Sequence, residues 1–366
     1  MYFDAHFTVK GKTPNTTWLG ARVSVAEGKE VKWQVHNPKG DRLSKIGKGI
    51  LYVNGTGKNE GDISVGDGLV FLAQNADTQG NQQAFNQIGI TSGRATVVIG
   101  AENQFNPNNL YFGFRGGRLD VNGHSLTFDR IQNTDDGAKI VNNNLDKSAT
   151  LTIKGINLSE KYIIWQKWQQ QATSHLSIYE YDNTWRGHRK DYFQLVGNPG
   201  RFYPVDQNSD SNWMFLSSNK DEAIKKVLDR YSKYQAFNGF LGETDFSKPN
   251  GILNINYAPQ REQFLLLSGG TELNGNFTVN TSTVLLSGRP TPHARDHLAN
   301  RDVEKDDDWI SREFNAKEFI VKNDGKFYVG RNVSAMNANI TGSGNSTMYP
   351  TIKTKKIKKQ IGIWLK

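Results

Sequence analysis

Short runs of alternating apolar and polar residues, separated by turn residues, are the dominant pattern of this chain. Residues 117–128 show it most clearly, since they read GRLDVNGHSLTF. Apolar side chains alternate with polar ones on both sides of Asn122-Gly123, and both residues of this dipeptide tolerate positive φ. The pattern predicts two half-buried strands that are joined by a tight corner.

Parts of this unit recur along the chain. Residues 49–55 (GILYVNG) repeat residues 117–123 (GRLDVNG), and residues 251–256 (GILNIN) repeat them without the last glycine. Looser copies occupy residues 150–155 and 264–269. Coils of about 20–25 residues would stack their strands in parallel about 4.8 Å apart. Because the spacing of the copies is irregular, we predict an all-β solenoid, a parallel β-helix with insertions.

The strand pattern divides the chain into two solenoid segments, residues 1–155 and 248–346. Residues 287–309 are polar and charged, and they predict a long loop between coils. The other predicted strands lie at residues 7–9, 23–25, 31–35, 63–65, 95–99, 253–257, 264–267, 277–279, 284–286 and 319–321.

Residues 156–247 predict a small mixed α/β subdomain that is inserted into the solenoid. Asn219 is a suitable N-cap, and Asp221 and Glu222 are favourable in the first turn of a helix. Four apolar residues then follow at helical spacing, and Gly239 is a candidate helix end. The four are Ile224, Val227, Leu228 and Tyr231.

The last stretch, residues 347–366, differs from the rest because it has six lysines and no acidic residue. One interpretation is a basic segment that binds a membrane surface. The other is a disordered tail translated out of frame. Without this stretch the net charge of +9 falls to 9 − 6 = +3, so the body is nearly balanced and we expect no nucleic-acid partner.

The composition supports an all-β protein. The chain has 36 glycines among 366 residues, which suits many short strands with tight turns. It has no cysteine, so disulfides, thiolate zinc sites and cysteine nucleophiles are excluded. Residues 1–6 (MYFDAH) do not resemble a signal peptide, and no run of about 18 apolar residues predicts a membrane-spanning helix.

Catalytic motifs are missing from the sequence. Neither Gly-Asp-Ser-Gly, Gly-x-Ser-x-Gly nor His-Glu-x-x-His occurs. His293 and His297 could share a metal on a helix, but the prolines at 290 and 292 favour a solvated loop. Asp306, Asp307 and Asp308 are acidic neighbours without the ligand spacing of a calcium loop. We expect no catalytic residue, no metal, no cofactor and no small-molecule ligand.

Two further stretches have alternative interpretations. Residues 113–117 (GFRGG) resemble a phosphate-binding loop, but no helix pattern follows them, which favours a solenoid corner. Four tryptophans of the subdomain could stack on sugar rings or form the subdomain's own core. They are Trp165, Trp168, Trp185 and Trp213.

Four stretches resemble the passenger of serine-protease autotransporters, a family that includes immunoglobulin A proteases and adhesion-and-penetration autotransporters. They are residues 41–49 (DRLSKIGKG), 63–68 (ISVGDG), 111–123 (YFGFRGGRLDVNG) and 287–294 (SGRPTPHA). The resemblance covers roughly residues 1–346. It implies a right-handed parallel β-helix with a small extruded subdomain, preceded by a chymotrypsin-like protease domain and followed by a membrane β-barrel.

The family's Ser-His-Asp triad lies upstream of the matched residues, so no catalytic residue is carried over. The resemblance implies a non-catalytic stalk that displays a protease domain at the bacterial surface, from an internal piece of a disrupted gene. Its partners would be that protease domain and the translocator barrel. An adhesin-type module that binds host surfaces or self-associates is the alternative, and residual peptidase activity is a second one.

Overall fold

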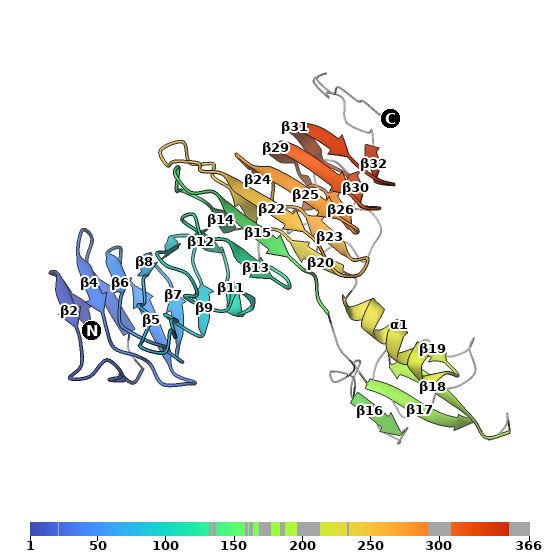
Figure 1. Ribbon diagram of the computed structural model, residues 1–366, viewed down its shortest axis with the longest axis horizontal. Helices are drawn as coiled ribbons and strands as arrows, with labels where there is room; N and C mark the ends of the chain where they lie inside the picture. The colour runs from blue at the N-terminus through green and yellow to red at the C-terminus, as the bar shows by residue number, and fades with distance from the viewer. Residues whose placement is uncertain are drawn as a thin grey trace. The chain divides into compact units, whose positions relative to one another are not determined.

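The computed structural model describes residues 1–20, 22–131, 133, 137–157, 160, 164–167, 177–183, 187–195, 213–232, 234–291 and 309–350. The chain forms two compact units (Figure 1). The solenoid unit contains Met1–Gly155 and Gln235–Lys366, and the inserted unit contains Ile156–Tyr234. Among the described residues, no helix is long and apolar enough to cross a bilayer.

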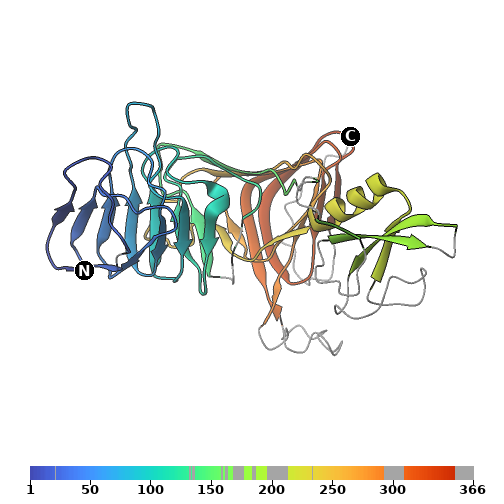
Figure 2. The same ribbon diagram turned by 90° about the horizontal axis from the view of Figure 1, so that it is seen from below.

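The first coils of the solenoid unit build a six-stranded sheet, hereafter sheet 1, in which every pair is parallel. Strands of successive coils lie side by side in it, as Figure 2 shows. In spatial order they are β1 (Tyr2–Phe3), β3 (Arg22–Val25), β5 (Arg42–Ile46), β7 (Asp62–Val65), β9 (Gln87–Ile90) and β11 (Leu110–Phe112). A single 3-10 turn, η1 (Pro107–Asn109), precedes β11.

A 15-stranded sheet, sheet 2, makes two further sides of the solenoid. One side contains β2 (Phe7–Val9), β4 (Glu30–Trp33), β6 (Ile50–Val53), β8 (Gly68–Leu72), β10 (Ala95–Ile99), β12 (Gly117–Asp120), β14 (Ala138–Val141), β21 (Phe240–Gly242) and β24 (Thr271–Glu272). The other contains β13 (Leu126–Phe128), β15 (Ala149–Ile153), β22 (Leu253–Tyr257) and β25 (Asn276–Asn280). The long strands β29 (Arg312–Lys322) and β31 (Val333–Gly342) pair with each other, and β29 joins both sides.

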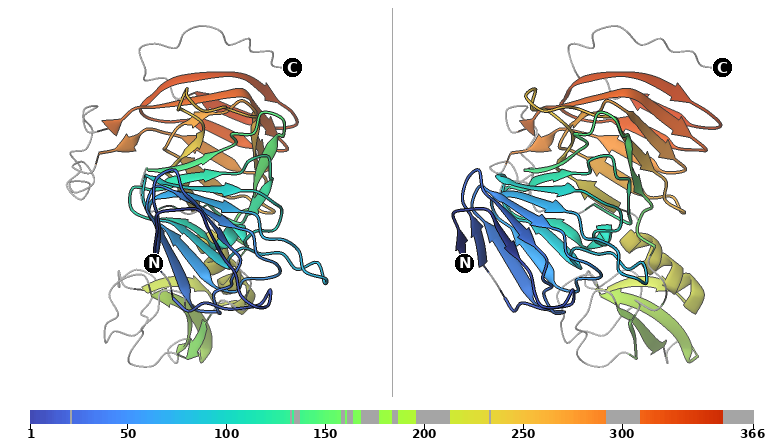
Figure 3. Two further views of the ribbon diagram at one scale, coloured as in Figure 1. Left: turned by 90° about the vertical axis from the view of Figure 1, so that its left-hand side faces the viewer. Right: turned by 60° about the vertical axis from the view of Figure 1, so that its left-hand side comes forward.

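A five-stranded sheet, sheet 3, belongs to the later coils, and its last four strands, orange and red in Figure 3, pair in parallel. It contains β20 (Tyr234–Phe237), β23 (Phe264–Leu267), β26 (Thr283–Leu286), β30 (Lys326–Val329) and β32 (Thr347–Pro350). The coil-to-coil parallel pairing confirms the predicted parallel β-helix.

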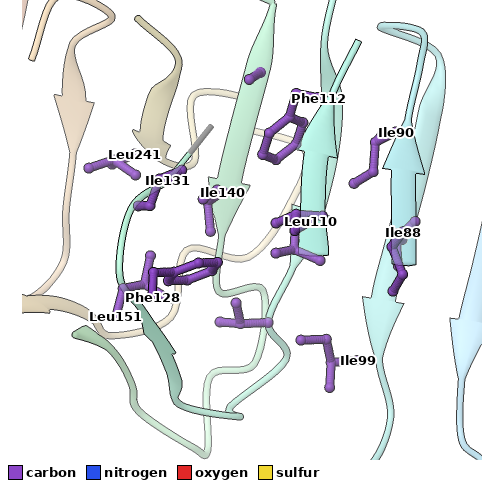
Figure 4. Packing of buried hydrophobic residues seen from close by; sticks show 14 of the residues in the cluster. Ile88, Ile90, Ile99, Leu110, Phe112, Phe128, Ile131, Ile140, Leu151 and Leu241 are labelled. Carbon is purple, nitrogen blue, oxygen red and sulfur yellow. The ribbon is translucent and has the colours of Figure 1, made fainter. Parts of the chain in front are cut away.

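The core lies inside the coils, because alternate residues of each strand point inward. In β10, Ala95, Val97 and Ile99 are buried while the residues between them are half-buried. Apolar side chains from successive coils stack on one another, as Figure 4 shows for Ile88, Leu110 and their neighbours. This period-2 pattern is the one that the sequence displayed.

Asparagine and glycine form the corners. Asn122 and Gly123 have φ of 47° and 82°, as a tight corner requires. The buried side chain of Asn142, one coil later, accepts a hydrogen bond from the Gly123 N–H at 2.8 Å and donates to the Ile252 carbonyl at 2.9 Å. One asparagine therefore links three successive corners.

The repeated sequence units do not mark equivalent positions of the coil. Residues 49–55 and 117–123 both enter the same side of sheet 2, at β6 and β12. Residues 251–256 enter its other side at β22, and residues 264–269 enter sheet 3 at β23. The repeated sequence forms a strand followed by a corner, and such a unit can occur on any side of the solenoid.

The inserted unit is a four-stranded mixed sheet with one helix. Its strands are β16 (Ile164–Lys167), β17 (Ser177–Asn183), β18 (Arg189–Leu195) and β19 (Trp213–Ser217), and its helix is α1 (Lys220–Ser232). Asn219 Oδ1 accepts hydrogen bonds from the backbone N–H groups of Asp221 and Glu222 at 2.9 and 3.1 Å, so the predicted cap is confirmed. The predicted apolar face packs on the sheet through Ile224, Val227 and Leu228, whereas the side chain of Tyr231 lies outside the described residues.

Two sequence-based boundaries are corrected here. The inserted unit ends at Tyr234 and not at 247, because Phe237 and Leu241 are buried in the solenoid core. Helix α1 accordingly ends at Ser232, well before Gly239, since β20 follows directly.

The tail and the long loop also contain strands. Residues 347–350 form β32, which pairs with β30, and Met348 packs against the core, so this part of the tail is ordered. Residues 351–366 lie outside the described residues. Within the predicted loop 287–309, β27 (Arg289–Pro290) pairs with β28 (Trp309–Ile310).

The two solenoid residues that flank the inserted unit, Gly155 and Gln235, lie at one buried side chain, that of Gln263. A Cβ on Gly155 would lie 2.3 Å from Gln263 Oε1, and Gln235 Nε2 donates to that same atom at 3.1 Å. Strands β15 and β22 pair directly across the insertion. Replacing residues 156–234 by a short Gly-Ser linker should therefore keep the melting temperature within about 2 °C, measured by circular dichroism. Loss of the strand-rich spectrum would contradict an independent solenoid.

Candidate interaction surface and buried charge cluster

Residues 113–117 form a corner of the solenoid, as the sequence predicted. They join β11 to β12, and Arg115, Gly116 and Gly117 have φ of 64°, 61° and 145°. The strand that follows excludes the helix N-terminus that a phosphate-binding loop requires.

The histidine and aspartate candidates of the long loop, His293, His297 and residues 306–308, lie outside the described residues. Within the part of the chain that the structure describes, no group of three His, Asp or Glu side chains is arranged to hold a metal ion.

Trp213 belongs to a core of the inserted unit. It is buried and packs edge-on against Tyr179, with ring centroids 5.1 Å apart, beside Phe193 and Leu195. This supports the core interpretation and leaves the ring no free face for a sugar. The side chains of Trp165, Trp168 and Trp185 lie outside the described residues.

A cluster of buried charges joins the coils on the two sides of the insertion. Arg118 Nη1 forms an ion pair with Glu243 Oε2, and the side chains are 15% and 1% exposed. Asn143 Nδ2 donates to the same carboxylate at 3.0 Å, and the backbone N–H of Asp245 donates at 2.9 Å. Lys139 Nζ donates to Thr244 Oγ1 at 2.7 Å.

The pKa values in this charge cluster follow from burial and hydrogen bonding. Burial would raise the pKa of Glu243, but the donors Asn143, the Asp245 backbone and Arg118 hold it below its usual value. Burial raises the pKa of nearby Asp120, against two backbone N–H donors from Asn143 and Asn122. Donors of this chain bind both of these carboxylates, so the cluster stabilises the contact between the coils.

Lys45 is a second buried charge, at an inward position where the paired residues of neighbouring coils are Val23 and Val65. Its Nζ donates to the carbonyl oxygens of Gly47 at 2.8 Å and Asp67 at 3.0 Å. Burial lowers the pKa of Lys45 to about 8.

The lowered pKa predicts a pH dependence. Between about pH 8 and pH 10.5 the unfolded chain binds more protons at Lys45 than the folded chain does, so folding stability from this group rises with pH. Compared with Lys45→Met, the wild-type protein should gain about 1–2 kcal/mol between pH 7.5 and 9.5. Urea unfolding of both proteins at both pH values measures this gain, and parallel pH profiles would show that Lys45 is not buried in solution.

The outer side of sheet 2 carries an unusual apolar surface. Successive strands place Ile50 beside Leu69, Tyr52 beside Phe71, and Phe71 beside Val98, all pointing outward and half-buried. The Tyr52 and Phe71 rings stack with centroids 5.0 Å apart and 7° between their planes. We call these five residues the apolar strip.

Polar residues border the apolar strip on both sides. Exposed Lys32 lies beside Tyr52 on the preceding coil, and the buried Asp120 lies beside Val98 on the following one. An apolar centre with polar neighbours is typical of protein contact surfaces. The sequence signal was the continuous apolar run of residues 69–72 (LVFL) where alternation predicts polar residues.

Comparisons with known proteins agree with this architecture. Residues 251–359 match the family model described as the PIC/HAP1/IgA0 second beta-solenoid repeat region. The chain is 42% identical over 374 residues to the immunoglobulin A1 protease autotransporter of Haemophilus influenzae, covering 95% of this chain and 22% of that protein. It is 44% identical over 357 residues to the adhesion and penetration protein autotransporter of the same species, covering 94% and 21%.

Among solved structures, the chain is similar to the Haemophilus influenzae Hap adhesin, with a TM-score of 0.70 and 41% identity over 95% of this chain and 32% of that one. The chain thus spans only about a fifth of the length of these curated relatives. The parallel coils and these identities together show that the chain belongs to the passenger region of the serine-protease autotransporters and folds as a right-handed parallel β-helix.

Proposed function

We propose that this chain is a non-catalytic stalk segment that displays the serine endopeptidase domain of a longer autotransporter at the bacterial surface. The observation that carries the proposal is the coil-to-coil pairing of sheet 2, which continues from β2 to β31 around the apolar core of the solenoid unit. A parallel solenoid of this kind is a stiff element, because each coil is fixed by hydrogen bonds and packing to both neighbours.

A segment exchange tests the stalk. In the immunoglobulin A1 protease autotransporter of Haemophilus influenzae, the matching segment is replaced by residues 1–350 of this chain. We expect the protease to remain detectable and active on whole cells, as measured by antibody labelling and digestion of immunoglobulin A1. A matched exchange that carries Phe319→Ala should reduce both signals, because that buried ring supports the core. Loss of display with the wild-type segment would contradict the proposal.

An adhesin-type module is the second candidate, and the apolar strip favours it. Purified chain should bind fibronectin-coated or epithelial surfaces, and Tyr52→Ser with Phe71→Ser should reduce binding at least tenfold. The control is Leu266→Ser with Leu285→Ser, an outward half-buried pair on sheet 3. Equal loss in both variants, or no binding by the wild-type chain, would argue against adhesion through the strip.

Residual peptidase activity is the third candidate. In the inserted unit, Ser217 and Ser218 donate hydrogen bonds to the carboxylates of Glu222 and Asp191, each at 2.6 Å. An activated serine needs a general base, usually histidine, at that position. A fluorophosphonate probe should therefore leave the chain unlabelled. Labelling at either serine would support residual peptidase activity.

A further inference from the structure

Three polar side chains and one backbone carbonyl form a buried corner between successive coils of the solenoid unit. We call the group of His36, Gly57, Gln74 and Gln104 the His36 corner. His36 is 6% exposed, and Gln74 and Gln104 are each 2% exposed. Gln74 Nε2 lies 2.9 Å from His36 Nε2 and donates to the Gly57 carbonyl at 3.2 Å.

The neighbouring bonds fix the orientation of the Gln74 amide. If the amide were reversed, its oxygen would face the carbonyl oxygen of Gly57, and two acceptors would meet in a buried site. The NH₂ group therefore points at both Gly57 and His36. Because this group only donates, His36 Nε2 must accept, and the imidazole must carry no proton on that nitrogen.

Gln104 holds Gln74 in place from the next coil. Its Oε1 accepts the Gln74 backbone N–H at 2.7 Å, and its Nε2 donates to the Gln74 carbonyl at 3.2 Å. These two bonds hold the Gln74 backbone, and the Gly57 carbonyl keeps its NH₂ group directed toward His36. If His36 Nε2 became protonated, two donors would face each other in a buried site, which breaks a hydrogen bond and leaves both groups unsatisfied.

We propose that His36 is an acid-sensitive switch, in which protonation of Nε2 opens the His36 corner and loosens the first coils of the solenoid. The site is folded and closed while the imidazole is neutral. Opening of the corner would also affect the preceding coil, which pairs with the His36 backbone. The His36 carbonyl accepts the Trp18 N–H at 2.7 Å, and the His36 N–H donates to the Thr16 carbonyl at 2.9 Å.

The electrostatic surroundings support a switch at mildly acidic pH. Burial lowers the pKa of His36 below 6.5, against a hydrogen bond that the imidazole donates to the Thr56 backbone carbonyl, which raises it. The unfolded chain therefore binds this proton first, and stability from the corner is present above about pH 6.5 and lost as the pH falls below it.

Carboxylates on the adjacent turns bond elsewhere. Asp41 accepts from Gly20 and from Asn37, Asp77 accepts from Asn81, and Glu102 bonds to His124 at 2.8 Å. The pKa shift of His36 follows from burial and from the Thr56 backbone hydrogen bond.

Hydrogen exchange of the full chain, read by mass spectrometry at pH 7.5 and pH 5.0 and corrected for intrinsic rates, tests the switch. We expect amides of residues 54–59 and 73–75 to lose protection at least tenfold at pH 5.0, while amides of β22 keep theirs. In His36→Gln, whose amide oxygen can accept from Gln74 at any pH, this loss should disappear. In His124→Gln, a histidine that pairs with Glu102 at a later corner, the loss should remain.

A measurement on the wild-type chain covers the case in which His36→Gln does not fold. Nitrogen-15 shifts of the His36 ring should show an unprotonated Nε2 at pH 7 and a proton-binding midpoint below pH 6.5. Unchanged exchange at pH 5.0, the same acid loss in His36→Gln, or a protonated Nε2 at pH 7 would each overturn the proposal.

Discussion

Replacing Glu243 by alanine should lower the free energy of unfolding of the solenoid by about 3–5 kcal/mol, because Arg118 would keep a charge in a largely buried site without its partner. The donors from Asn143 and the Asp245 backbone would lose their acceptor as well. Urea unfolding monitored by circular dichroism measures the loss.

Glu262→Ala is the matched control for this experiment. Glu262 also forms an ion pair, with Lys326 at 2.8 Å, but its side chain is 62% exposed and that of the lysine is 42% exposed. An exposed pair of this kind contributes about 0–1 kcal/mol, so this variant should be nearly as stable as the wild type. Equal destabilisation by the two replacements would show that burial of the Arg118–Glu243 pair is not what matters.

Removing the Phe319 ring should have an effect of similar size. Phe319 is fully buried between two other rings, with centroids 5.7 Å from Phe277 and 5.0 Å from Phe327. Phe319→Ala removes apolar contacts and leaves a cavity that a stacked solenoid cannot close without breaking its pairing, so we expect a loss of about 3–5 kcal/mol.

The neighbouring residue Ile320 supplies the control for Phe319, since it belongs to the same strand but is only half-buried on the outer side. Ile320→Ala should cost about 1 kcal/mol or less in the same urea experiment. If Phe319→Ala cost no more than Ile320→Ala, the alternation along β29 would have been assigned to the wrong side.

Local sequence was sufficient to predict many strands and one helix end. The strands at 95–99 and 253–257 match β10 and β22 residue for residue, because alternation of side chains is a property of each strand alone. The Asn122-Gly123 corner and the Asn219 cap were also predictable, since each depends on contacts within a few residues.

Tertiary structure decided which side of the solenoid each strand occupies. Residues 49–55 and 251–256 are nearly the same in sequence, yet β6 and β22 lie on different sides of sheet 2. The choice depends on the length of the preceding corners and on which coil offers a free strand edge. Neither quantity is encoded in the strand itself.

The same reason explains what sequence analysis missed in the candidate sites. Arg118 and Glu243 are 125 residues apart. They lie before and after the inserted unit in the sequence, and their coils become neighbours only in the folded solenoid. Lys45 sits in an inward row, although its residue type alone predicts exposure. The sequence by itself determined the strands, corners and cap, because short-range sterics and hydrogen bonds control them. The stacking of the coils decided which side of the solenoid each strand occupies, that Arg118 pairs with Glu243, and that the inserted unit ends at Tyr234. These three features depend on packing between residues far apart in the chain.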